Sequence, residues 1–130
     1  MERVTDLSQI QAADYTWRSK VGLDTETIDD IFPKFENEVR ELTEVMSNGR
    51  DREDFVSELA DISLMAIAMM SSLGIDASAA ITSKIDRNFN KYRGEDIQTL
   101  QNDGMSHQQA MKAVKEKWDK TQDRNYVKGI

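Results

Sequence analysis

Two pairs of acidic residues with the same spacing constrain how this chain can fold. Glu38 and Glu41 form the first pair and Glu58 and Asp61 the second, each pair separated by two residues. On a helix this spacing places both side chains on one face. The intervening segment 47–51, Ser-Asn-Gly-Arg-Asp, suits a short helix–helix connection. If the two helices run antiparallel, the four carboxylates converge, and a hard divalent cation is the usual way to offset their repulsion.

The rest of the chain predicts an all-α fold. Six glycines and a single proline punctuate the sequence, and no segment alternates apolar and polar residues as a strand does. Apolar stripes at helical spacing predict five helices, at about 7–20, 25–47, 52–73, 77–92 and 106–122. The second of these starts either after Thr25 or near Phe32, since Pro33 suits a first turn better than a helix interior.

We therefore expect a four-helix core bundle with an additional C-terminal helix, within a single domain spanning 1–130. The core covers about 7–93, and Gly94 ends its fourth helix. The extension 95–130 begins with a polar segment, 95–104, that we expect to be irregular. A core of this size often gains further buried apolar surface by forming oligomers.

Composition excludes several classes of protein. A net charge of −7 argues against general binding to nucleic acid or to a membrane surface. The absence of cysteine and the single His107 exclude thiolate sites and sites built from several histidines of one chain. No apolar run approaches the length of a membrane span, and the polar start of the chain is unlike a signal peptide. We expect a soluble protein of the cytoplasm.

An acidic helix face is usually just solvated, but two features favour a binding site here. The acids border the apolar stripes, where an unpaired charge is costly. No matching set of Lys or Arg lies on the same faces, and Arg40 projects about 100° around the helix from its neighbours. Four oxygen ligands without nitrogen or sulfur favour Mg²⁺, with Mn²⁺ as a substitute. Mg²⁺ in turn favours phosphoryl or nucleotidyl chemistry.

This segment resembles the MazG-like nucleotide pyrophosphohydrolases, part of the all-α NTP pyrophosphatase superfamily. Their E-x-x-E and E-x-x-D signature is matched by Glu38-Val-Arg-Glu41 and Glu58-Leu-Ala-Asp61. Their K-x-x-x-N element on the next helix is matched by Lys84 and Asn88, and the resemblance covers about 7–93.

The chain departs from the family pattern at two places. Many relatives have Glu directly before the first metal-binding Glu, where this chain has Asn37. Where relatives often have Arg after the K-x-x-x-N element, this chain has Lys91, with Arg93 two positions later. The first difference affects the surroundings of the metal, and the second leaves open which cation holds the phosphates.

The resemblance implies hydrolysis of a nucleoside triphosphate, or its deoxy form, to the monophosphate and pyrophosphate. All four acids would hold Mg²⁺, and Glu41, or Glu38 beside it, would act on the attacking water. The polyphosphate would be bound by side chains of the fourth helix and just beyond it: Lys84, Asn88, Lys91 and Arg93. Ordinary helix-surface charge or a packing hydrogen bond is the alternative role for these residues.

The part of the site that reads the base is less defined by the sequence. Trp17 is a candidate stacking platform, although packing in a core or an interface is the more frequent role of such a residue. Gln11 and Asp14 on the same helix are candidates for reading the base edge. Short stand-alone relatives suggest a homodimer or homotetramer and deoxynucleotide substrates such as dGTP. The alternatives are a related pyrophosphatase acting on dUTP or on a non-nucleotide diphosphate, and a non-catalytic helical interaction protein.

Overall fold

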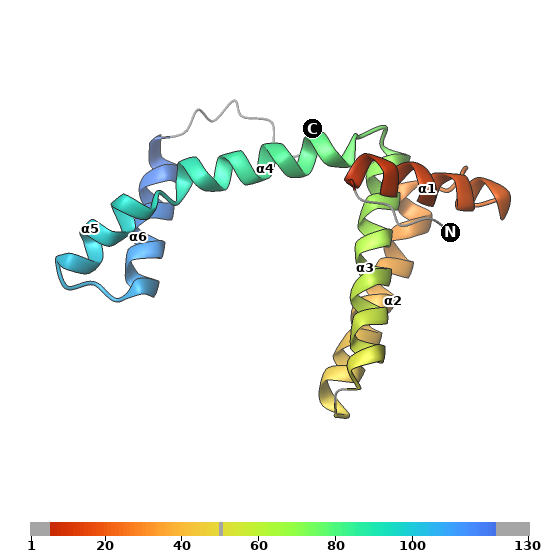
Figure 1. Cartoon of the computed structure of the whole chain (residues 1–130), viewed down its shortest axis with the longest axis horizontal. Helices are drawn as coiled ribbons and strands as arrows, with labels where there is room; N and C mark the ends of the chain where they lie inside the picture. The colour runs from red at the N-terminus through yellow and green to blue at the C-terminus, as the bar shows by residue number, and fades with distance from the viewer. Residues whose placement is uncertain (1–5, 50, 122–130) are drawn as a thin grey trace. The chain divides into compact units, whose positions relative to one another are not determined.

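The computed structural model describes residues 6–49 and 51–121, and all the regular elements in these ranges are α-helices (Figure 1). The predicted all-α fold is therefore confirmed. The helices are α1 (Leu7–Lys20), α2 (Ile28–Ser47), α3 (Arg52–Ser72), α4 (Ala77–Lys91), α5 (Gly94–Asn102) and α6 (His107–Thr121).

The second helix takes the longer of the two predicted forms. Thr27 is the N-cap of α2, and its backbone N–H donates to Asp30 Oδ2 at 2.9 Å. This capping interaction fixes the start of the helix ahead of Pro33. Pro33 lies inside α2, where it removes one backbone donor without ending the helix.

The region between α4 and α6 differs from the prediction. Residues 95–104 were expected to be irregular and Gly94 to end the fourth helix, and both expectations are wrong. Helix α4 ends at Lys91, Arg93 is the N-cap of α5, and Gly94 is the first residue of that helix. Acidic side chains in the first turn of α5 favour its start, because they interact well with the helix dipole.

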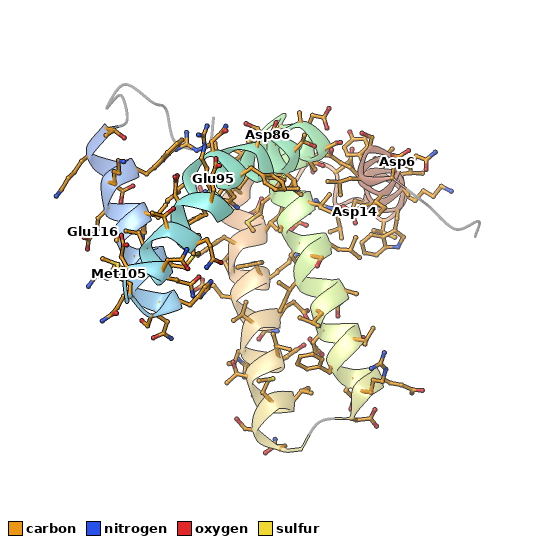
Figure 2. All side chains as sticks on the ribbon, turned by 60° about the vertical axis from the view of Figure 1, so that its left-hand side comes forward. Asp6, Asp14, Asp86, Glu95, Met105 and Glu116 are labelled. Carbon is orange, nitrogen blue, oxygen red and sulfur yellow. The ribbon has the colours of Figure 1, made fainter. Side chains whose placement is uncertain are left out.

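The chain forms two compact units that divide after Ser78, in the first turn of α4. In the first unit, α2 and α3 run antiparallel as a hairpin, and α1 packs against α3 (Figure 1). In the second unit, α5 packs against α6, and Ala110 and Val114 on α6 are buried. Figure 2 shows Met105 in the connection between these two helices. The single domain over 1–130 stays a prediction.

Gln11 joins α1 to the end of α3. Its side-chain amide donates to Ser71 Oγ at 3.1 Å and to the backbone oxygen of Ile75 at 2.9 Å. Its oxygen accepts from the backbone N–H of Ala77, a fully buried residue, at 2.9 Å. Because both ends of the amide are occupied within the fold, Gln11 has a structural role and is not available to read a base edge.

Helix α3 is long and apolar enough, by length and composition alone, to cross a membrane. The central helix of a water-soluble protein passes the same test, and α3 carries Glu58 and Asp61 on the side that contributes to the acidic cluster described below. Helix α3 packs against α2 and α1, although only 11% of its apolar stretch is buried within the chain.

Candidate metal centre

The α2–α3 hairpin forms where the turn chemistry predicted it. Gly49 in the connection has φ +87°, a conformation that glycine adopts without strain. Asp51 caps α3, since its Oδ1 accepts from the backbone N–H of Glu53 at 2.9 Å. The turn at Gly49 and the cap at Asp51 let the two helices run antiparallel, so that acids 20 residues apart in the sequence face one another.

Glu38, Glu58 and Asp61 come together between α2 and α3. Each offers one carboxylate oxygen, and these oxygens all lie within 4.8 Å of one another. Ligands on opposite sides of a Mg²⁺ ion lie about 4.2 Å apart, given metal–oxygen distances of about 2.1 Å. A small contraction would therefore let these side chains share one hard divalent cation. The all-oxygen donor set suits Mg²⁺ or Mn²⁺.

Two carboxylate oxygens in this cluster have no partner. Glu38 Oε2 and Glu58 Oε2 are buried and form no hydrogen bond. Within the described ranges, no Lys or Arg forms an ion pair with either residue. Arg40, the nearest cation in sequence, instead pairs with Glu44 at 3.3 Å, on the exposed face of α2. Buried carboxylate oxygens without a donor are the observation that best fits a site for a cation.

The electrostatics of Glu38 reflect the same crowding. Burial raises the pKa of Glu38 from 4.5 to about 7. The Glu58 carboxyl group adds to this rise, because a protonated Glu38 can share its hydrogen with it, and the negative charges of Glu41 and Asp61 add further. Without a metal, the cluster therefore holds a proton near neutral pH.

Glu41 is not part of the group that lies within 4.8 Å. Its Oε1 accepts from the side-chain amide of Asn37 at 3.1 Å. The amide oxygen of Asn37 in turn accepts from Arg40, which fixes the orientation of the amide. The residue at which this chain departs from its relatives therefore contacts the acid predicted to act on water.

The other candidates of the first unit lie on α1. Trp17 is 54% exposed, so it is not part of the core of this chain. Stacking on a base and packing against a second copy are the two roles still open to it. Asp14, labelled in Figure 2, has a buried Oδ2 without a hydrogen-bond partner. Burial raises the pKa of Asp14, while the positive charge of Arg18 opposes the rise.

The predicted phosphate-binding residues all lie in the second unit. Lys84 and Asn88 are exposed and one turn apart on α4, and Lys91 is half-buried at the end of that helix. Arg93 is exposed at the N-cap of α5. Contact of these residues with a phosphate stays a prediction.

Sequence reasoning missed the contribution of Asn37 and treated it only as a departure from a pattern. The available signal was its position four residues before Glu41, where side chains on a helix are neighbours. The helix α5 was also missed, although Glu95 and Asp96 followed by Ile97 and Leu100 is a helix-start pattern.

The sequence model of one protein family, described as phosphoribosyl-ATP pyrophosphohydrolase, matches residues 16–88, more than half of the chain. The matched range contains all four acids of the two pairs as well as Lys84 and Asn88, whereas Lys91, Arg93 and helices α5 and α6 lie outside it. Searches among curated proteins and among solved structures found no significant match.

Proposed function

Because the chain belongs to the phosphoribosyl-ATP pyrophosphohydrolase family, we propose that it hydrolyses nucleoside triphosphates or their deoxy forms to the monophosphate and pyrophosphate. This family is part of the MazG-like superfamily, so the resemblance predicted from the sequence is confirmed. The protein is a nucleotide pyrophosphohydrolase, a hydrolase acting on acid anhydrides. The alternative of a non-catalytic helical interaction protein does not agree with this membership.

The observation that best supports the proposal is the orphaned pair of oxygens on Glu38 and Glu58. These residues and Asp61 would hold Mg²⁺, for which Mn²⁺ is a substitute, and Glu41 on the same helix as Glu38 is the fourth ligand that we propose. When bound, the metal neutralises phosphate oxygens and lowers the pKa of a bound water. The protein holds its ligands on two helices of one hairpin, a rigid support for such a site.

Glu41 is the residue that we assign to the attacking water, with Glu38 as the second candidate. Asn37 donates to Glu41 Oε1, which leaves Glu41 Oε2 free to accept a proton from water. The pyrophosphate part of the substrate carries the larger negative charge, and Lys84, Lys91 and Arg93 are cations that would bind it, with Asn88 donating a hydrogen bond. Trp17 would stack on the base.

Two classes of substrate are candidates. Deoxynucleoside triphosphates such as dGTP are the substrates suggested by short stand-alone relatives, and dUTP or a non-nucleotide diphosphate is a related alternative. Phosphoribosyl-ATP is the second class, since it is the substrate in the description of the matching family. All of them contain the bond between the α- and β-phosphates that this chemistry cleaves.

We also propose that the protein acts in the cytoplasm as a homodimer or homotetramer, without nucleic acid or a membrane as a partner. Large apolar side chains of the hairpin are exposed in the single chain. They lie on both helices: Phe32, Val39 and Met46 on α2, and Val56, Leu59 and Leu73 on α3. Exposed apolar side chains in this number on one hairpin favour burial against a second copy.

Substrate profiling tests the proposal. Purified protein is incubated with Mg²⁺ and, separately, with each (d)NTP, dUTP and phosphoribosyl-ATP, and the products are separated by anion-exchange chromatography. We expect a monophosphate and pyrophosphate from at least one compound. Glu58→Gln should reduce turnover about a hundredfold or more, because the metal loses a ligand.

The matched control is Glu36→Gln, which removes an exposed acid from α2 outside the cluster and should leave turnover unchanged. Circular dichroism is used to check that each variant retains its helices. The absence of turnover with every compound by folded protein would refute the proposed reaction. Turnover of phosphoribosyl-ATP alone would refute the deoxynucleotide preference and retain the reaction class.

A further inference from the structure

The second unit contains a pocket of about 710 Å³, which falls in the size range of small-molecule sites. Its walls come from the end of α4, from α5 and from α6, and its residues all lie between 90 and 121. Figure 1 shows α5 and α6 side by side. The residues around the pocket lie beyond residues 16–88, the range that the family model matches.

One side of this pocket is positively charged. Lys91, Arg93 and Lys117 line it, whereas Asp96 is its single acidic residue. Within the described part of the chain, none of the three cations forms an ion pair. The Lys91 ammonium group lies 5.2 Å from the centre of the Tyr92 ring, a contact that leaves its charge without an anion. Cations also outnumber carboxylates over residues 79–130, although the whole chain is acidic.

The other side of the pocket is apolar and aromatic. Leu100 on α5 and Val114 and Trp118 on α6 contribute to it. The Arg87 guanidinium lies 5.7 Å from the centre of the Trp118 ring and holds that side chain in place. The hydroxyl groups of Thr99 and Thr121 lie at the pocket as well, where they can bond a ligand with polar substituents.

We propose that this pocket binds a nucleoside phosphate, with its phosphate near Lys91, Arg93 and Lys117 and its base against the wall formed by Leu100 and Trp118. Charge complementarity selects an anion, and the apolar wall selects a flat organic group in the same ligand. Inorganic phosphate satisfies only the first requirement and a nucleoside only the second. The concave shape favours a small molecule over an extended strand of nucleic acid.

Binding to this pocket can be tested without the reaction proposed above, because it needs neither a metal nor turnover, whereas identifying the ligand as the substrate rests on that reaction. Lys91 and Arg93 are also candidates for binding the substrate polyphosphate. The ligand of the pocket is therefore either the substrate, held through its phosphates, or a separate nucleotide that regulates the enzyme. Both ligands would offer a phosphate and a base to the pocket, and the kinetic experiment below distinguishes them.

The test follows the indole N–H signals of the two tryptophans by NMR in ¹⁵N-labelled full-length protein containing EDTA. Trp17→Phe serves only to assign the two signals. AMP, adenosine and inorganic phosphate are titrated separately. We expect AMP to shift the Trp118 signal saturably, and adenosine and phosphate to bind about tenfold more weakly or worse, since each lacks one group of contacts.

Lys117→Ala should weaken AMP binding about tenfold, the usual effect of losing one charge-assisted contact. Lys115→Ala is the matched control, because Lys115 is an exposed cation of the same helix outside the pocket. Both side chains are exposed, so neither substitution removes packing. Equal weakening by both variants, or a Trp118 signal that AMP does not move, would overturn the proposal. Movement of the Trp17 signal alone would do the same.

Kinetics with Mg²⁺ and a hydrolysed triphosphate then identify the source of the ligand. If Lys117→Ala raises KM by the factor by which it weakens AMP, the pocket binds the substrate. If basal turnover is unchanged, and added AMP alters the turnover of wild type but not of Lys117→Ala, the pocket binds a separate regulator. A protein without any turnover leaves the binding test intact, so failure of the reaction and failure of the pocket are distinguishable.

Discussion

Glu38 on α2 and Glu58 on α3 face each other across the hairpin, and each has a buried carboxylate oxygen without a hydrogen-bond partner. Two like charges in such a position destabilise the fold unless a proton or a cation lies between them. The raised pKa of Glu38 indicates that a proton takes this role in the metal-free protein. A divalent cation would displace it, so proton and metal compete for one place.

The first prediction concerns the stability of metal-free protein. The folded state binds the Glu38 proton more tightly than the unfolded state, since the pKa is about 7 when folded against 4.5 for the free side chain. This contribution to stability is complete below about pH 4.5 and is lost as the pH rises through about 7. Thermal melts in EDTA should therefore show a Tm that falls across this window. In Glu38→Gln the fall should be smaller and the Tm at pH 8 higher than in wild type.

The second prediction concerns metal binding. Because the metal must displace the proton of Glu38, apparent affinity should rise up to about tenfold per pH unit below pH 7 and level off above it. Mn²⁺ or Mg²⁺ should raise the Tm more at pH 8 than at pH 6, since a ligand of the folded state alone stabilises it. Glu36→Gln should keep the effect and Asp61→Asn should lose it. An equal rise in Tm at both pH values would contradict the competition.

The third prediction concerns Asn37 as a positioning residue. Its amide holds Glu41 Oε1, so Asn37→Ala should lower kcat about tenfold while changing KM little, because Glu41 would be misdirected without loss of a substrate contact. Glu44→Gln is the control, since it breaks only the exposed ion pair with Arg40 and should leave kcat within about twofold. A variant in which KM rises and kcat is retained would assign Asn37 to substrate binding instead.

Much of the fold could be predicted from the sequence because local signals agreed with one another. Helix α1 begins and ends as expected, with Asp6 capping it, and the turn at Gly49 brings the acids together. The capping interaction of Thr27 with Asp30 decided where α2 starts, and it depends on local hydrogen bonds that a periodic pattern does not reveal. Helix α5 is short, so its apolar period is weak, and its first-turn acids were the better signal.

The site could be predicted in part for a similar reason. Spacing places Glu38, Glu58 and Asp61 on facing helix sides, and backbone geometry alone brings them together. The position of Glu41 depends on its rotamer and on Asn37, which spacing does not determine. Spacing does not reveal the surroundings of Gln11 and Asp14: Gln11 bonds residues 60 or more positions away, and Asp14 retains a buried oxygen without a partner.

The fourth prediction concerns the proposed oligomer. Val56 on α3 is 52% exposed, and a charge there should weaken packing against a second copy. Val56→Glu should therefore shift the mass measured by light scattering toward that of a single chain, 14.9 kDa, at micromolar concentration. Gln108→Glu, which adds the same charge at an exposed polar position of α6, outside the hairpin, should retain the wild-type mass. A wild-type protein of single-chain mass would refute the oligomer.

The fifth prediction concerns Arg18, the buried cation of α1. Its guanidinium donates to the backbone oxygen of Leu23 at 2.9 Å and to Glu26 Oε1 at 3.3 Å, and its side chain is only 7% exposed. Arg18→Ala would leave both acceptors short of a donor and should lower the free energy of unfolding by about 2–3 kcal/mol. The pair of Glu26 with Lys34 at 2.6 Å keeps part of the charge compensated, which limits the loss.

Urea unfolding followed by Trp17 fluorescence in a Trp118→Phe background measures this effect, because Trp17 is adjacent to Arg18 in the sequence and reports on the first unit. Lys20→Ala is the control, since it removes an exposed cation from the last turn of the same helix and should cost about 0.5 kcal/mol or less. If Arg18→Ala and Lys20→Ala destabilise equally, the interaction at Arg18 is only that of a basic residue with the helix dipole. A larger loss of stability for Arg18→Ala would show that the contacts of its guanidinium with Leu23 and Glu26 stabilise the connection between α1 and α2.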